Sequence, residues 1–565
     1  MNDFINNINL TRKNWAPSEA WELNLLKNQE QDKILHQKYP PSEQDKFYAK
    51  QYGKVLINNI DKLDQQSINK STDAMIAIGT LFTIPTILSP IIGGIGGYLI
   101  SKSNKKLKNQ RKLTSFNGAM IGSGIYFIFR EYFRAQLEKM TTRIARFQTR
   151  NNELKNSSNF IIHTPEQDLQ TKSAYDKTPN NEINIAKNTN ILKTYKDAFK
   201  TFKEMKKDYK EYTKWKKDFK TKELECLNNI NGTNFSNEEL SIAQKSRNNI
   251  INTLHKLELA SNNEEINFQY AIDVVLFITK MFGVALASLL TFAIPKNSSK
   301  TIIPKKLENV LKLTVPLSIP IFALFTTPIL TKYQKDSAKL GRYEIKKELL
   351  NDENNFITYD DNTRKQIDLD IQTPQKLNIF NKVIQDIKSL KTIPKRLNEM
   401  YLDLSLTKKD IVNSSTLNIS EKQKQDAELL QKQLFYAFEK IDEKSEGFSD
   451  DIDALMHILK YTIGTIVNMG LNIYSFNLLA NRLKNYNGNK MPEFFEGIKL
   501  MKKLSQKDLM AIFILPYAIK SILCIILDTI SAQGRKKANK IGIMTAIKDL
   551  ENEKVFTKEY LENVI

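Results

Sequence analysis

Apolar residues gather into six blocks along this chain, and long polar stretches rich in Lys and Asn separate the blocks. The first block, residues 74–100, has no charged side chain, and the second block, residues 113–129, follows after a short basic loop. A helix needs about 20 apolar residues to span the hydrocarbon core of a bilayer. The first block is long enough and the second is at the lower limit, so together they predict a transmembrane helical hairpin.

The same arrangement occurs three times along the chain. Four landmarks keep the same order in each copy: an early Glu, an Asp where the first apolar block begins, a Gln after the second block, and a closing Leu with a Phe six residues later. This shared order predicts an internal triplication. The landmarks are Glu43, Glu239 and Glu421; Asp73, Asp273 and Asp453; Gln136, Gln334 and Gln533; and the pairs Leu154/Phe160, Leu350/Phe356 and Leu550/Phe556.

We therefore predict an all-α, multi-pass membrane protein with six transmembrane segments, arranged as three tandem helical hairpins with long helical polar arms. The segments are expected at about 74–100, 113–129, 274–295, 313–331, 461–481 and 509–527. The predicted domains are a polar N-terminal arm (1–41), hairpin unit 1 (42–165), a basic aromatic-striped arm (166–235), hairpin unit 2 (236–360), an amphipathic arm (361–419) and hairpin unit 3 (420–565).

Small residues are spaced regularly in both helices of the first hairpin. Ser89, Gly93 and Gly97 recur at every fourth position of the first helix, and Gly118 and Gly122 do so in the second. This spacing places small side chains on one face, where two backbones can approach closely. We interpret these residues as a helix-packing seam, although glycine is also common in membrane helices in general.

Ionisable residues at the edges of the apolar blocks are the candidate polar sites. Asp273 and Lys280 are seven residues apart, and Asp453 and Lys460 repeat this spacing with His457 between them. One interpretation is a proton or ion relay. The other, which we favour, is that each Asp caps the start of its helix and each Lys extends toward the membrane surface. A further candidate, in the sixth segment, is Lys520.

Aromatic residues follow a helical stripe in the arm at residues 193–222, which also has a net positive charge. A basic helix with such a stripe fits the surface of an anionic membrane, so anionic lipid head groups are one expected partner. The alternative, which we favour slightly, is an ordinary amphipathic helix that packs its stripe on another part of the protein.

The net charge of +21 attracts anionic partners in general. Nucleic acid binding would rest on charge alone, because no recognised binding module accompanies it, and we do not expect it. The sequence has no phosphate-binding glycine loop, no His-Glu-x-x-His and no Cys-x-x-Cys, and its four histidines stand apart from one another. We therefore expect no cofactor, no metal site and no enzymatic activity.

These observations favour a non-enzymatic membrane scaffold or interaction protein, with the lipid bilayer as its main partner. The alternative is a transporter or oligomeric pore that uses the intramembrane Asp and Lys residues. We expect the inner membrane of a bacterium as the location, and the small-residue faces also suit a homo-oligomer. Basic hairpin loops favour the cytoplasm for the loops, whereas the polar start of the chain, which has no secretory signal, favours the cytoplasm for the arms, so the orientation stays open.

Overall fold

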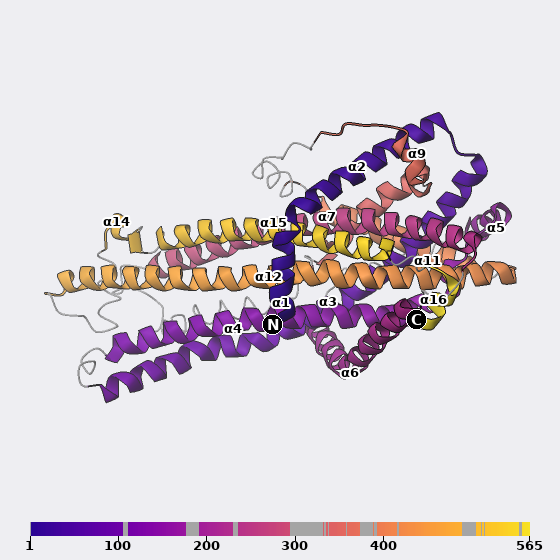
Figure 1. Cartoon of the computed structure of the whole chain (residues 1–565). Helices are drawn as coiled ribbons and strands as arrows, with labels where there is room; N and C mark the ends of the chain where they lie inside the picture. Colours follow the sequence, from indigo (N-terminus) through magenta and orange to yellow (C-terminus); the bar gives the residue numbers. More distant parts are fainter. Residues whose placement is uncertain are drawn as a thin grey trace.

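The protein is helical throughout the residues that a computed structural model describes, and these residues contain no strand (Figure 1). The all-α prediction is therefore confirmed. The described residues are all except 1, 105–110, 177–190, 230–234, 294–330, 333–334, 337, 358, 373–387, 389–391, 415–416, 489–503, 510, 513–514 and 553–555. The predicted segment at 313–331 lies almost wholly outside them.

Three very long helices organise the molecule: α3 (Glu43–Ser103), α7 (Asn237–Ala293) and α12 (Glu421–Tyr486). Each runs without a break from a polar stretch into an apolar block. Two further long helices, α4 (Arg111–Thr149) and α15 (Leu515–Asn552), return along α3 and α12. In Figure 1 the ends of both hairpins point toward the same side of the molecule, and most of the shorter helices gather around the other half.

Each arm contributes one longer helix: α2 (Trp15–Lys38), α6 (Ile191–Asn229) and α11 (Ile393–Ser414). Helix α2 contacts α15, α6 contacts α3 and α4, and α11 contacts α5. The remaining elements are short. They are α1 (Asn2–Lys13), the π-helix η2 (Arg150–Leu154), the 3₁₀ helix η3 (Ser157–Phe160), α5 (Pro165–Asp176), the 3₁₀ helix η5 (Glu353–Phe356), α9 (Asp361–Lys365), α14 (Gln506–Leu509) and α16 (Lys558–Val564).

The three long helices begin in the same way. Ser42, Ser236 and Ser420 each accept a hydrogen bond on the hydroxyl from the backbone N–H three residues later, at 3.1, 3.2 and 3.2 Å. The side chain of that third residue accepts a bond from the serine N–H in return. This reciprocal pairing is a capping box, which fixes where a helix starts. The helices therefore begin 30 to 36 residues before Asp73, Asp273 and Asp453, and the prediction that Asp273 and Asp453 cap helix starts is wrong.

The closing Phe residues of the three units meet in one core at the polar end. Phe160, Phe356 and Phe556 are all buried and share this core with Leu residues of α3, α7 and α12. Two of these Phe residues lie in short 3₁₀ helices that pack on another unit. The helix η3 of the first unit packs on α12 of the third, and η5 of the second unit packs on α3 of the first. At the second contact the Phe356 ring lies so close to Gly53 that an added Cβ would be 2.3 Å from it. The units thus interlock at this end.

All four predicted packing glycines lie at the contact between α3 and α4. A Cβ on Gly93 would be 2.3 Å from the backbone oxygen of Gly118, and a Cβ on Gly97 would be 2.2 Å from that of Thr114. A Cβ on Gly122 would be 2.9 Å from Cα of Gly93 and 3.0 Å from the oxygen of Ser89. The two backbones therefore touch, and only glycine fits at these positions.

The membrane prediction finds no direct support in the helices themselves. In the part of the chain that the structure describes, no helix is long and apolar enough to cross a membrane. The side chains of residues 83–88 in α3 and of residues 272–293 in α7, which fall in two of the predicted segments, are outside the described ones.

A substitution in the seam tests the packing of the first hairpin. We expect Gly118→Val to destabilise the protein by at least ~1–3 kcal/mol, because the added side chain overlaps backbone atoms that cannot move aside independently. Gly96→Ala is the matched control, since nothing lies within 4 Å of its Cβ position, and it should be neutral or slightly stabilising. Chemical denaturation of the purified variants measures both effects, and equal stability of the two variants would contradict the seam.

Candidate functional site

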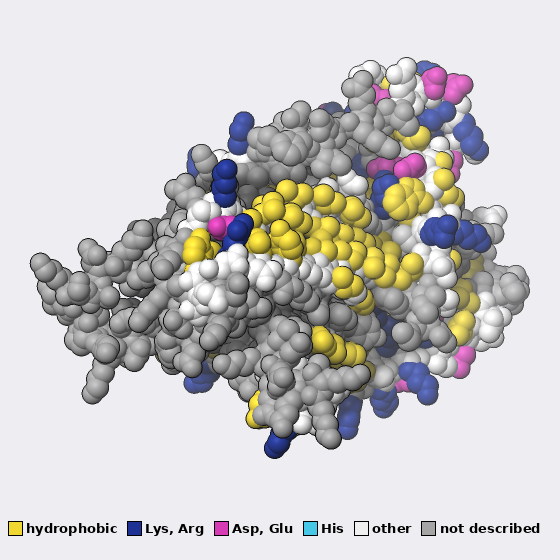
Figure 2. Space-filling view, turned by 90° about the vertical axis from the view of Figure 1, so that its left-hand side faces the viewer, with side chains coloured by type: hydrophobic (Ala, Val, Ile, Leu, Met, Phe, Trp, Pro, Cys, Tyr) yellow, Lys and Arg dark blue, Asp and Glu magenta, His cyan; other side chains and the backbone are white. Residues whose placement is uncertain are grey.

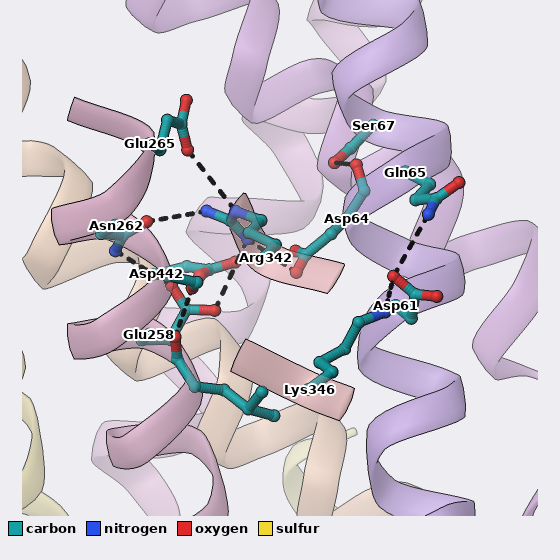
Figure 3. A network of polar contacts seen from close by, with 12 residues as sticks. Asp61, Asp64, Gln65, Ser67, Glu258, Asn262, Glu265, Arg342, Lys346 and Asp442 are labelled. Carbon is teal, nitrogen blue, oxygen red and sulfur yellow. Dashed lines mark hydrogen bonds and ion pairs between the residues drawn. The ribbon is translucent and has the colours of Figure 1, made fainter. Parts of the chain in front are cut away.

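Buried charges lie at the same height on all three long helices. Asp64, Glu258 and Asp442 each stand 22 residues after the capping serine of their helix, and each is at most 5 % exposed. Figure 3 shows the three side chains grouped around Arg342, which belongs to the helix at residues 338–351. Because buried carboxylates need compensation, this group defines the candidate site.

Arg342 connects the first two units. Its Nη1 lies 2.6 Å from Asp64 of α3 and 3.8 Å from Glu258 of α7, and its Nη2 donates to the Asn262 side chain at 2.8 Å. Burial alone would lower the pKa of Arg342, but the carboxylates of Asp64, Glu258 and Glu265 outweigh burial and raise the pKa well above its usual value. The guanidinium is therefore held in its charged form.

One turn further along the same helix, Lys346 forms an ion pair with Asp61 of α3. Burial lowers the pKa of the Lys346 ammonium well below its usual value. The charge of Lys346 consequently depends on the carboxylate beside it, and the pair fixes how the second unit meets the first.

A second pair of basic residues repeats this contact between the first and third units. Arg146 at the end of α4 lies 3.1 Å from Asp442 of α12 through Nη1. Arg150 donates from Nη2 to the same carboxylate at 2.5 Å and also pairs with Glu439. Asp64 and Asp442 thus have equivalent basic partners, as do Asp61 and Glu439, which both stand 19 residues after their serines.

The third unit has no basic pair at the corresponding positions. Arg146 and Arg150 stand eight and four residues before the closing Leu154, and the residues eight and four before the closing Leu550 are Gly542 and Ala546 of α15. Gly542 allows α15 to approach α12 closely, since its Cβ position is 2.5 Å from Cα of Ser445. On α7, the position of Asp61 and Glu439 is occupied by His255.

His255 is buried and forms no ion pair with any residue that the structure describes. Its Nε2 makes no hydrogen bond with any described residue, and its ring meets the edge of Trp21 with centroids 5.1 Å apart. Burial lowers the pKa of His255 to about 4, and the nearby Lys256 adds to this effect. The imidazole is therefore neutral near pH 7.

Only part of the predicted polar set can be placed. Lys460 of α12 donates to Asp528 of α15 at 2.5 Å, and Asp453 accepts from Ser531 at 3.3 Å and lies 3.5 Å from Arg535. These contacts hold the third hairpin together. The side chains of the other candidates lie outside the described residues; they are Asp273, Lys280, His457 and Lys520.

The aromatic stripe of the 193–222 arm packs inward. Met205 of α6 is buried against Ala74 and Ile144, and Trp215 and Phe219 contact the aromatic residues of α12. Most of the stripe therefore serves tertiary packing, whereas Phe199 and Tyr209 are 39 and 44 % exposed and, with the lysines of α6, remain on the surface.

The sequence analysis did not predict the buried basic residues, because its candidate polar sites were limited to the edges and interiors of the apolar blocks. These residues are Arg146, Arg150, Arg342 and Lys346. Arg146 and Arg342 stand eight residues before the closing leucine of their units, and Arg150 and Lys346 stand four before it. An alignment of the three units on these leucines would have found the pattern. The described residues contain no group of His, Cys, Asp and Glu suited to a metal ion.

Comparison with known proteins adds no family: no family model, no curated protein and no solved structure matches this chain.

Removal of Arg342 tests the charge cluster. We expect Arg342→Met to destabilise the protein by about 3–5 kcal/mol, because it leaves the Asp64 and Glu258 carboxylates buried without their cation. Lys395→Met is the control, since the Lys395 side chain is 85 % exposed. Equal denaturation midpoints for the two variants would contradict a role of the cluster in holding the units together.

His255 predicts a pH dependence of stability. Its pKa in the folded state is lower than in the unfolded chain, so the unfolded state binds more protons between about pH 6.5 and 4. Stability should therefore fall as the pH drops through this window, by roughly 3 kcal/mol in total. His255→Gln should flatten this part of the stability profile, whereas His163→Gln, at a half-buried position, should change it less. An unchanged slope in His255→Gln would refute the assignment.

Proposed function

We propose that the chain is a non-enzymatic membrane scaffold, in which interlocked polar ends form a platform and the apolar hairpin ends contact lipid. The observation that carries this proposal is the exposure of large apolar side chains along both described hairpins. Figure 2 shows apolar side chains gathered in a broad band on the face seen from the hairpin ends. On water-soluble surfaces, apolar patches larger than a few hundred Å² mark interaction sites.

The glycine seam explains why these side chains face outward. Because α3 and α4 touch backbone to backbone, their bulky residues are turned away from the contact. Ile92, Ile95 and Ile100 of α3 are 67, 56 and 59 % exposed, and Ile125 and Phe129 of α4 are 53 and 58 % exposed. Water solvates such a surface poorly, whereas acyl chains cover it without cost.

The third hairpin has a similar surface. Its exposed apolar residues recur at helical spacing along one face of α15 and are accompanied by exposed residues of α12. They are Ile519, Ile522, Ile526 and Ile530 of α15, and Leu459, Ile463, Ile466 and Tyr474 of α12. Both hairpins point to the same side in Figure 1, so both surfaces can enter the same layer.

The position of α6 also supports this arrangement. Its first half packs on α3 at Ile76 and Ala77, where the apolar block of α3 begins. Most lysines of its outer face are exposed, which suits anionic lipid head groups at the edge of the layer.

The transporter alternative receives less support. Lys460, which it would use for ion movement, is paired with Asp528 on the facing helix, and such a pair stabilises hairpin packing without any transport role. The scaffold therefore remains the favoured function.

Membrane insertion can be tested with charged substitutions on the exposed apolar surface. A lysine near the centre of a membrane helix costs roughly 3 kcal/mol. We expect Ile95→Lys combined with Ile466→Lys to release the chain from vesicles, as measured by flotation and carbonate extraction. Leu169→Lys on α5 is the control, because Leu169 is 69 % exposed at the polar end.

Three outcomes are distinguishable. Wild-type protein that floats with vesicles and resists carbonate, together with the double variant's release, supports the proposal. Release of the wild-type chain by carbonate contradicts it. A wild-type chain that stays in water as a defined oligomer, and becomes monomeric in the double variant, would assign the apolar surface to contacts between copies.

A further inference from the structure

The outward face of α6 carries a row of lysines. Seven of them recur at alternating steps of four and three residues, which places them in two adjacent columns on one face of the helix. All seven are exposed, and none forms an ion pair with a residue that the structure describes. With a rise of about 1.5 Å per residue, the row is about 32 Å long. Its members are Lys196, Lys200, Lys203, Lys207, Lys210, Lys214 and Lys217.

Acidic residues form a separate exposed column beside the lysine row, at every seventh position of α6. They are Asp197, Glu204, Glu211, Asp218 and Glu225. Glu204, Glu211 and Asp218 each follow a lysine of the row by four residues, and this order is less favourable for an ion pair than the reverse order. None of these three forms an ion pair with a described residue. Two columns of opposite sign therefore remain open on the surface, with the same seven-residue period.

The opposite face of α6 is fixed by packing. Ala198, Met205 and Phe219 are at most 8 % exposed and are separated by multiples of seven residues. At the flank of this face, Lys216 and Lys220 lie 2.7 and 3.4 Å from the Glu443 carboxylate of α12. These contacts hold the helix in one rotation about its axis, so the lysine row stays on the outside of the molecule, where Figure 1 places α6.

Only the first part of the row can reach the lipid layer of the proposed scaffold. The exposed aliphatic side chains of the first and third hairpins begin at Leu81 of α3 and Leu459 of α12, both 39 residues after the capping serine. Ala198 packs with Ala77, four residues before Leu81. Glu443, which meets the second half of α6, stands 16 residues before Leu459, which is about 24 Å along the helix. This distance is about three Debye lengths at physiological ionic strength, so lipid charge has little effect on the second half of the row.

The charge pattern of the second half fits another helix better than a nucleic acid. Carboxylates spaced by three and four residues on a partner helix stay opposite the lysine row along its length, because both helices have the same period. Basic side chains of the partner can meet the acidic column, which fixes the register. A nucleic acid backbone is negative throughout, so Glu211 and Asp218 would repel it. A second copy of α6 would place lysines against lysines.

We propose that the outward face of α6 binds an acidic helix of a partner protein, chiefly through Lys207, Lys210, Lys214 and Lys217. The partner helix lies along α6 with its carboxylates opposite these lysines. Individual surface ion pairs contribute little, so binding depends on several pairs formed together and weakens as salt is added. The argument against lipid as the occupant rests on the proposed membrane contact, whereas the charge pattern is independent of it.

The test uses the full-length chain in the detergent or buffer that keeps it monodisperse, and two synthetic helical peptides of equal length and composition. In the first peptide, glutamates recur at alternating steps of three and four residues on one face, and in the second they are spread around the helix. Fluorescence anisotropy of the labelled peptides measures binding. We expect the first peptide to bind at least ~10-fold more tightly than the second, and its affinity to fall at least ~10-fold between about 50 and about 300 mM NaCl.

Two variants of equal net charge separate the row from the general basicity of the chain. The row variant should bind the first peptide at least ~10-fold more weakly at an unchanged thermal midpoint, whereas the control variant should bind it as the wild type does. The row variant combines Lys207→Gln, Lys210→Gln, Lys214→Gln and Lys217→Gln. The control combines Lys33→Gln, Lys172→Gln, Lys395→Gln and Lys558→Gln, at side chains that are 61–85 % exposed.

The proposal is overturned if the two peptides bind equally, if the row variant binds like the wild type, or if a DNA duplex of equal charge binds more tightly than the first peptide. Self-association of the wild-type chain that is lost in the row variant would also overturn it, because the occupant would then be a second copy. Flotation with vesicles tests the scaffold separately. The row variant should float as the wild type does, so failure of peptide binding and failure of membrane contact are distinct results.

Discussion

The architecture depends on ion pairs that are buried between units distant in sequence. Arg150 and Asp442 are 292 residues apart, yet they hold the end of α4 against α12. Arg342 and Asp64 do the same for the second and first units. A misplaced unit would leave these charged groups buried without a partner, and each unpaired buried charge costs several kcal/mol. The pairs therefore specify which helices meet and at what height, while the shared apolar core supplies most of the stabilisation.

The three units differ at the positions four and eight residues before their closing leucines. The first two units have a basic pair there, which meets carboxylates of another unit, whereas the third unit has Gly542 and Ala546, and Gly542 packs closely on α12. Glu258 lies 3.8 Å from the Arg342 guanidinium of its own unit, and the His255 imidazole remains neutral near pH 7.

The two ends of the molecule follow different physical rules. At the polar end, closing turns and capped helix starts satisfy backbone groups, and Phe160, Phe356 and Phe556 complete a core that excludes water. At the hairpin ends, helices contact each other through glycines and leave isoleucines exposed. Small residues inside and large apolar residues outside are the reverse of the pattern in water, and the same as the pattern that favours packing in lipid.

The sequence by itself determined the helical class, the regular order of landmarks and the close-packing glycines, because these depend on local spacing along one or two adjacent helices. It misplaced the helix starts: Asp73 and Asp453 resemble capping residues, but the capping boxes at Ser42 and Ser420 precede them, so each polar stretch and apolar block form one helix. Only the tertiary structure decided which unit pairs with which, because partners such as Arg146 and Asp442 carry no local signal. It also decided that most of the α6 stripe packs on α3, α4 and α12, since this depends on elements that meet only after the chain has folded.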